Sequence, residues 1–172
     1  MTKEWLIADT HFGHKNIIKY SNRPFANTEE MDKKIIENWN NTVAKQDSIF
    51  HLGDVSFYNK EKTIQIIDQL NGRKILVMGN HDFSTGTVKW WKDVFDIVIP
   101  YPIILKDHFI LSHEPISYLS GSVPFVNVHG HTHDDSTYTI SSNRYSVCVE
   151  QIGYKPILFT DIIRYYKEKL EE

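Results

Sequence analysis

Short apolar runs alternate with amphipathic segments in the first half of the chain. Three runs have the length of a strand and end at a polar residue or a glycine: residues 5–8, 48–52 and 74–78. Between the first two, an apolar residue recurs at every fourth position, as on one face of a helix: Met31, Ile35, Trp39 and Val43. Asn27 predicts the N-terminal cap of that helix, with Glu30 completing a capping box. Residues 60–70 predict a second helix, which Asn71 and Gly72 end. This order predicts a largely parallel sheet covered by helices.

The second half of the chain is richer in predicted strands. Two apolar runs within residues 96–112 predict a hairpin with its turn at 106–107. Residues 125–128 and 145–149 predict further strands, and Thr160 is placed to cap a final helix. The whole pattern indicates an α/β fold in which two sheets pack together with helices outside.

Length and composition are those of an ordinary globular protein. The chain has 172 residues, a net charge of −3 and no internal repeat, so we expect a single domain over residues 1–172. No apolar run approaches the roughly 20 residues of a membrane span, and no signal peptide is recognisable, which favours a cytoplasmic protein without a membrane partner. One cysteine excludes an internal disulfide and a thiolate-rich zinc site. Nine histidines stand out instead, since histidine is the main neutral metal ligand.

Five short polar segments each follow a predicted strand. They are residues 9–11, 53–54, 79–82, 112–115 and 130–133. In open α/β sheets, ligands bind beyond the carboxyl ends of the strands, so we expect these segments to meet at one edge. Together they offer oxygen and nitrogen ligands without sulfur, in a set that suits Mn²⁺, Fe, Zn²⁺, Ni²⁺ or Co²⁺: Asp9, His11, Asp54, Asn80, His113, His131 and His133. Seven ligands exceed what one ion with an open position takes and fit two ions, the arrangement used for in-line displacement at phosphorus.

These five segments, in this order, resemble the calcineurin-like metallophosphoesterase superfamily. Its pattern is Asp-x-His, Gly-Asp, Gly-Asn-His-Asp/Glu, His and Gly-His-x-His, and all five parts are intact between Asp9 and His133. The opening run of residues 9–14 and the sequence Arg-Pro-Phe at 23–25 also resemble small bacterial and phage members. The resemblance implies two mixed β-sheets packed as a sandwich flanked by helices. No segment is long enough for a separate cap domain.

The resemblance also implies a role for each ligand. Two divalent transition-metal ions, with Mn²⁺ favoured, are each held by three residues, the first by Asp9, His11 and His133 and the second by Asn80, His113 and His131. Asp54 bridges the two ions. His81 touches no metal and protonates the leaving oxygen, and Asp82 hydrogen-bonds His81.

The expected activity is hydrolysis of a phosphoester by in-line attack of a metal-bridging hydroxide, with His81 as the general acid. Phosphodiesters are favoured, including nucleotides and nucleic-acid ends, and phosphomonoesters are the alternative substrates. A second hypothesis is a non-catalytic, metal-binding scaffold for protein interactions. Such members typically lose the active-site histidine or several ligands, so the intact set counts against it.

Two further residues have open assignments. Arg23 is a candidate to bind substrate phosphate, and the alternative is a salt bridge that pins its loop. His14 either lines the pocket or caps the short helix that follows it. We expect an open pocket shaped by loops at residues 56–60, 83–87 and 117–123.

Overall fold

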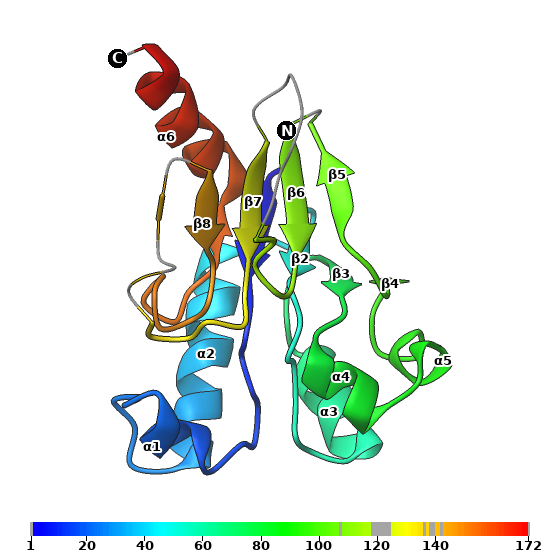
Figure 1. The fold of residues 1–172 in the computed structure, drawn as a ribbon. Helices are drawn as coiled ribbons and strands as arrows, with labels where there is room; N and C mark the ends of the chain where they lie inside the picture. Colours follow the sequence, from blue (N-terminus) through cyan, green and yellow to red (C-terminus); the bar gives the residue numbers. More distant parts are fainter. Residues whose placement is uncertain are drawn as a thin grey trace.

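The computed structural model describes residues 2–106, 108–117, 125–135, 137, 140–141 and 143–171. Within these residues, the first sheet has five strands in the order β4-β3-β2-β1-β9 (Figure 1). Strands β1 to β4 run parallel to one another, and β9 is antiparallel to β1. Their bounds are β1 (Glu4–Ile7), β2 (Ser48–His51), β3 (Arg73–Val77), β4 (Ile97–Ile99) and β9 (Ile157–Leu158).

The second sheet has four strands in the described part of the chain, in the order β5-β6-β7-β8. Strand β5 pairs antiparallel with β6, whereas β6, β7 and β8 are parallel. Their bounds are β5 (Ile103–Leu105), β6 (Phe109–Ser112), β7 (Val126–His129) and β8 (Arg144–Ser146). Both sheets are therefore mixed, which confirms the predicted fold class.

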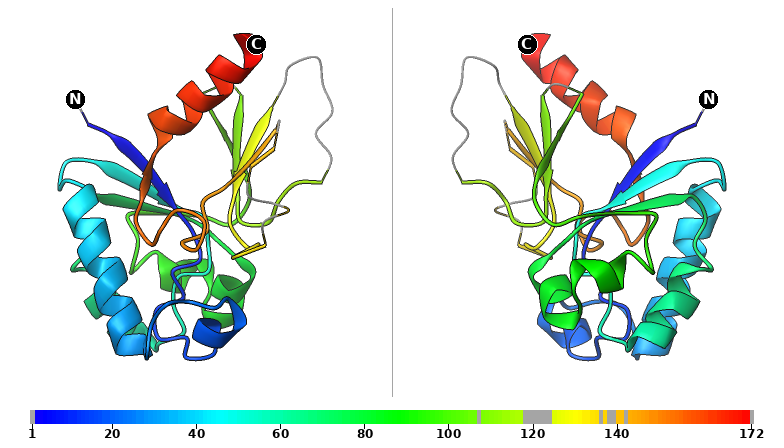
Figure 2. Two further views of the ribbon diagram at one scale, coloured as in Figure 1. Left: turned by 90° about the vertical axis from the view of Figure 1, so that its left-hand side faces the viewer. Right: turned by 90° about the vertical axis from the view of Figure 1, so that its right-hand side faces the viewer.

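Two helices cover the outer face of the first sheet, α2 (Thr28–Thr42) and α3 (Lys60–Ile67) (Figure 2). The cap of α2 is as predicted, because Asn27 Oδ1 accepts a hydrogen bond from the Glu30 N–H at 2.9 Å. The Glu30 carboxylate, however, accepts from the N–H of Ala26 and not from that of Asn27. The remaining helices are α1 (Ile17–Tyr20), α4 (Asn80–Thr85), α5 (Val88–Trp91) and α6 (Phe159–Glu171).

Both faces of the first sheet are buried. Successive strand residues point to opposite sides of a sheet, and each side is covered by another layer of the fold. One set packs beneath α2 and α3, and includes Ile7, Ile49 and Leu76. The neighbouring residues pack against the second sheet and α6, and include Leu6, Phe50 and Ile75. The apolar runs of the sequence thus form the central layer between helices on one side and the second sheet on the other (Figure 2).

The predicted hairpin over residues 96–112 is only partly correct. Its first apolar run is divided between the sheets, since β4 joins the first and β5 pairs with β6 in the second. Pro100 and Pro102 lie at the division, and proline cannot donate to a strand ladder. The strand predicted at 145–149 is also shorter, because β8 ends at Ser146 and Cys148 forms an isolated bridge with Ala8, which directly follows β1. This bridge joins the two sheets beside the candidate site.

No helix in the part of the chain that the structure describes is long and apolar enough to cross a membrane.

Candidate metal centre

The polar segments that follow the strands meet at the end of the sandwich where β1, β2, β3, β6 and β7 finish (Figure 1). Backbone hydrogen bonds join them in pairs. The N–H of Asp9 donates to the carbonyl of Gly53 at 3.0 Å, and the N–H of Gly130 donates to that of His113 at 2.9 Å. Four of the five segments are therefore joined in two pairs by the backbone alone, and carboxylate side chains link the pairs to each other and to residues 79–82.

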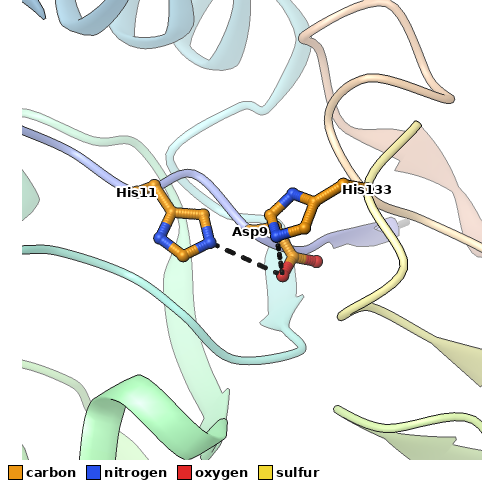
Figure 3. A group of neighbouring side chains, drawn as sticks. All are labelled: Asp9, His11 and His133. Atoms are coloured by element: carbon orange, nitrogen blue, oxygen red, sulfur yellow. Dashed lines mark ion pairs between the residues drawn. The ribbon is translucent and has the colours of Figure 1, made fainter. Parts of the chain in front are cut away.

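A first group of ligand atoms is formed by Asp9, His11 and His133 (Figure 3). Asp9 Oδ1 lies 3.9 Å from Nε2 of each histidine. Among the contacts of the described residues, neither Asp9 Oδ1 nor His11 Nε2 has a hydrogen-bond partner, although both are buried. Buried polar atoms without partners are costly, and a cation between these three atoms removes that cost. The group therefore fits a divalent metal ion.

A second group of ligand atoms is formed by Asp54, His113 and His131, with Asn80 beside it. The Nδ1–H of His113 donates to the Leu52 carbonyl at 2.8 Å, so Nε2 carries a lone pair when the ring is neutral, the form that a metal ligand requires. That lone pair lies 2.9 Å from Asn80 Oδ1, which is also an acceptor. Two acceptors at this distance repel each other unless a positive charge lies between them. The second group therefore also fits a metal ion.

Asp54 lies between the two groups. Its Oδ2 atom is 3.6 Å from Nε2 of His11 in the first group and 3.5 Å from Nε2 of His113 in the second. One carboxylate oxygen thus faces both positions, which is the placement required of a bridging ligand.

Each carboxylate also uses its other oxygen to hold a neighbouring segment. Asp9 Oδ2 accepts a hydrogen bond from the backbone N–H of His131 at 2.9 Å. Asp54 Oδ1 accepts one from the backbone N–H of His81 at 3.0 Å. The ligand-bearing loops are therefore positioned by the same two residues that face the candidate ions.

The backbone at the centre is strained. Of the described non-glycine residues with positive φ, five belong to the ligand set: Asp9, His11, Asp54, His131 and His133. Such conformations are rare outside glycine and cluster at functional sites, where the surrounding structure holds them. Gly53 has a φ of +87°, and a Cβ added there would lie 2.6 Å from the main chain of Gly79. The close approach of these two loops explains both glycines.

His81 lies outside both groups but next to them. Its Nε2 is 4.0 Å from Asp54 Oδ2, and the side chain is 44% exposed. The ring contacts Phe57, with centroids 4.9 Å apart, and His11, with centroids 5.6 Å apart. This placement leaves its outer edge accessible to a molecule bound at the two groups.

The expected hydrogen bond between Asp82 and His81 does not appear among the contacts of the described residues. Both oxygens of the buried Asp82 carboxylate accept instead from backbone N–H groups, those of Asp54, Val55 and Gly79. The two residues are consecutive in α4, and neighbouring side chains on a helix point about 100° apart. Asp82 therefore ties the loops after β2 and β3 together.

For Arg23, the structure favours the structural alternative. Its guanidinium is buried and donates to the carbonyls of Asp9 and Thr10, at 2.7 and 3.1 Å. It also pairs with the Glu150 carboxylate at 2.7 Å. These contacts occupy the N–H donors that a substrate phosphate would need. Arg23 therefore holds the backbone of the segment that carries the first ligands.

Glu150 is the residue that sequence reasoning missed. Its Oε1 accepts a hydrogen bond from Nδ1 of His133 at 3.0 Å, which leaves Nε2 of that ring facing Asp9. Burial acts to raise the pKa of Glu150, but the hydrogen bond from His133 and the charge of Arg23 outweigh it and hold the pKa below its ordinary value. A carboxylate of this kind fixes the ring orientation of a ligating histidine. The sequence feature that could have identified Glu150 is its position directly after the predicted strand at 145–149.

The histidines around the first group differ in environment. Burial, aided by the charge of Arg23, lowers the pKa of His11 well below its usual range, so its ring is neutral, as a metal ligand must be. His14 stacks on Phe57 with centroids 3.9 Å apart and does not cap α1, whose N-cap residue is Asn16. His14 therefore lies at the edge of the site. Of the loops expected around the pocket, residues 118–123 lie outside those described.

Comparison with known proteins agrees with this geometry. The MJ1445 protein of Methanocaldococcus jannaschii, which is uncharacterised, is 39% identical over 171 residues, covering 95% of this chain and 91% of its own. The Gene 66 protein of Mycobacterium phage L5 is 33% identical over 85 residues, covering 48% of this chain and 41% of the phage protein. The crystal structure of AQ665 from Aquifex aeolicus, a protein of unknown function, has a TM-score of 0.74 at 28% identity and covers 96% of this chain and 100% of its own. The family model of the calcineurin-like phosphoesterases matches residues 3–166, and this chain belongs to that family.

Proposed function

We propose that this chain is a dinuclear metal-dependent phosphodiesterase. The observation that supports it best is the position of Asp54 Oδ2, which lies 3.6 Å from one ligand group, 3.5 Å from the other and 4.0 Å from Nε2 of His81. Asp54 Oδ2 is thus close to both candidate metal positions and to the half-exposed imidazole of His81. This is the arrangement needed for displacement at phosphorus with protonation of the leaving group.

Seven residues would hold the two ions, for which we propose Mn²⁺: Asp9, His11 and His133 in the first group, Asn80, His113 and His131 in the second, and Asp54 between them. When bound, two such ions would lower the pKa of a bound water and neutralise the charge of the phosphoryl oxygens.

His81 supplies the proton in this proposal. Its backbone is held by Asp54 and its ring contacts Phe57, so that the half-exposed imidazole would be available to a phosphoester bound at the two ligand groups. The protonated ring donates to the oxygen that leaves phosphorus. This contribution matters most for alkyl leaving groups, which are poor without a proton. His14, stacked on Phe57, lines the same side of the site.

The preference for diesters follows from charge. A phosphomonoester brings a second negative charge, which a free guanidinium or ammonium beside the metals would stabilise. The guanidinium of Arg23 reaches the first ligand group, but it is committed to Asp9, Thr10 and Glu150. A diester, with a single negative charge, makes no such demand.

Hydrolysis assays on metal-loaded protein test the proposal. The chain is stripped with chelator, loaded in turn with Mn²⁺, Fe²⁺, Zn²⁺, Ni²⁺ and Co²⁺, and assayed with bis-p-nitrophenyl phosphate and p-nitrophenyl phosphate at equal concentration. The proposal predicts metal-dependent turnover that is faster with the diester. A greater kcat/KM for the monoester would overturn the diester preference, and ion binding without turnover of either compound would favour the scaffold hypothesis.

A further inference from the structure

A pocket of about 380 Å³ adjoins the second ligand group. It lies between the start of α4, the connection from β4 to β5 and the segment that follows β6. Asn80 and His113 belong both to its wall and to the second group. The pocket is thus continuous with the place where the phosphoester would bind, and its volume is in the range of small-molecule sites.

Two aromatic side chains line this pocket and are strongly exposed, Phe83 at 54% and Tyr101 at 66%. Large aromatic groups left in solvent beside a polar centre mark a binding surface more than a packing requirement. The lining is also partly apolar and stiff, since it includes Pro100, Pro102 and Pro115. Flat, rigid apolar walls suit a planar ring.

The charged side chains that line the pocket further restrict the chemical class of its ligand. Among the described residues that line it, there is no lysine or arginine, and the acidic side chain is that of Glu114. A second phosphate or a carboxylate would therefore be repelled. A neutral ring that carries N–H donors is accommodated, because the Glu114 carboxylate can accept from them.

Phe57, the aromatic residue on the other side of the centre, is less suited to stack on a planar ligand. The ring of Phe57 is stacked on His14 at 3.9 Å and contacts His81 at 4.9 Å between centroids. Its faces are already used to hold residues of the site. Among the described residues, Phe83 and Tyr101 are the exposed aromatic side chains that line the pocket beside the second group.

From the continuity with the ligand groups, the exposed aromatic walls and the single acidic side chain, we infer that this pocket binds the nucleobase of a nucleoside phosphoester. The inference rests on the proposed function, since it places the phosphate at the two ligand groups. It assigns Phe83 and Tyr101 to substrate selection, with stacking on the base as their contribution. Removal of base stacking typically weakens binding by roughly 5- to 100-fold.

Two ligands that differ only in the base provide the test. Protein loaded with Mn²⁺ is titrated in a calorimeter with AMP and with ribose 5-phosphate, which share the sugar and the phosphate. We expect AMP to bind at least about tenfold more tightly. In the Phe83→Ala/Tyr101→Ala double variant, the ratio of the affinity for AMP to that for ribose 5-phosphate should fall towards one. The affinity for ribose 5-phosphate and for inorganic phosphate should be retained.

Tyr20→Ala is the matched control. Tyr20 is 71% exposed and close to His14, but it does not line the pocket, so its loss should leave the ratio unchanged. Equal affinities for AMP and ribose 5-phosphate in the unmodified protein would overturn the inference, as would an undiminished ratio in the double variant. Because the readout is binding, this failure is distinct from an absence of hydrolysis, which would count against the proposed function.

Discussion

The Glu150 carboxylate accepts a hydrogen bond from Nδ1 of His133 at 3.0 Å and so decides which ring nitrogen faces Asp9. The same oxygen lies 2.7 Å from Nη2 of the buried Arg23. A residue 127 positions away in sequence from Arg23 thus fixes a ligand of the first group. This buried network supplies the outer partner that a metal-binding imidazole requires.

The substitution Glu150→Gln should weaken metal binding at the first group selectively. The amide keeps the shape of the side chain but loses the charge, and loss of such outer partners typically costs about 10- to 100-fold in metal affinity. Calorimetric titration with Mn²⁺ should show one weakened and one unchanged site. Equal affinities in the variant and the unmodified protein would contradict the role of Glu150.

Three controls separate this effect from loss of stability. Glu150→Gln leaves the charge of Arg23 buried and unpaired, so the double variant Arg23→Met/Glu150→Gln is titrated as well. Because Arg23 also donates to the carbonyls of Asp9 and Thr10, Arg23→Met alone is titrated too, and loss of the first ion in the double variant but not in Arg23→Met assigns the effect to the contact between Glu150 and His133. Asp93→Asn, which breaks an exposed ion pair with Lys60, should leave both affinities unchanged.

Replacement of the bridging carboxylate should affect both ions. Asp54→Asn lowers the ligand charge at both groups, whereas Asp9→Asn lowers it at the first group alone, because the amide oxygen can still accept the hydrogen bond from the His131 N–H. Metal analysis after gel filtration in Mn²⁺-free buffer should give fewer than one ion per chain for Asp54→Asn and about one for Asp9→Asn. The same metal content in both variants would argue against a bridging position.

His81→Ala should separate metal binding from catalysis. Its ring lies outside both ligand groups, so the variant should retain two ions per chain. With an alkyl phosphodiester, kcat should fall by about 10²- to 10⁴-fold, the usual contribution of a general acid. With bis-p-nitrophenyl phosphate, whose leaving group needs little protonation, the loss should be much smaller. Equal losses on the two substrates would contradict proton donation by His81.

Asp32 gives a pH-dependent prediction away from the ligands. Burial raises the pKa of its carboxyl from 3.8 to about 6, against the opposing effect of the hydrogen bond from the Gly13 N–H. Because the folded pKa lies above the unfolded one, the ionised group destabilises the folded state above pH 6, and this penalty fades as the pH falls from 6 towards 4. Asp32→Asn should therefore increase the free energy of unfolding by up to about 3 kcal/mol at pH 8 and by about 1 kcal/mol at pH 4.5. Urea unfolding of both proteins at each pH measures the difference, and an increase that does not shrink on acidification would contradict it.

Strand ends were the most informative part of the sequence. Because Asp9, Asp54 and His113 each follow a buried apolar run, the parallel topology alone was enough to expect them at one edge, and the structure brings them together there. The same rule points to Glu150, which follows the last predicted strand.

Adjacency in sequence was less informative. It suggested a contact between Asp82 and His81, but helical geometry separates their side chains and backbone donors occupy Asp82. The partners of Arg23 could not be foreseen either, since Glu150 is brought to it only by the assembled fold. Pro100 and Pro102 indicate in the sequence that the chain breaks between β4 and β5. The sheet that each of these strands joins depends on long-range pairing, which the sequence does not indicate.

The most direct test of the central claim is the rate of bis-p-nitrophenyl phosphate hydrolysis as a function of Mn²⁺ bound per chain. Chelator-stripped protein is titrated with Mn²⁺, and the bound metal and the rate are measured on the same samples. The account predicts that activity follows the formation of chains with two ions and reaches its maximum at two ions per chain. Full activity at one bound ion, or no hydrolysis at two, would contradict it.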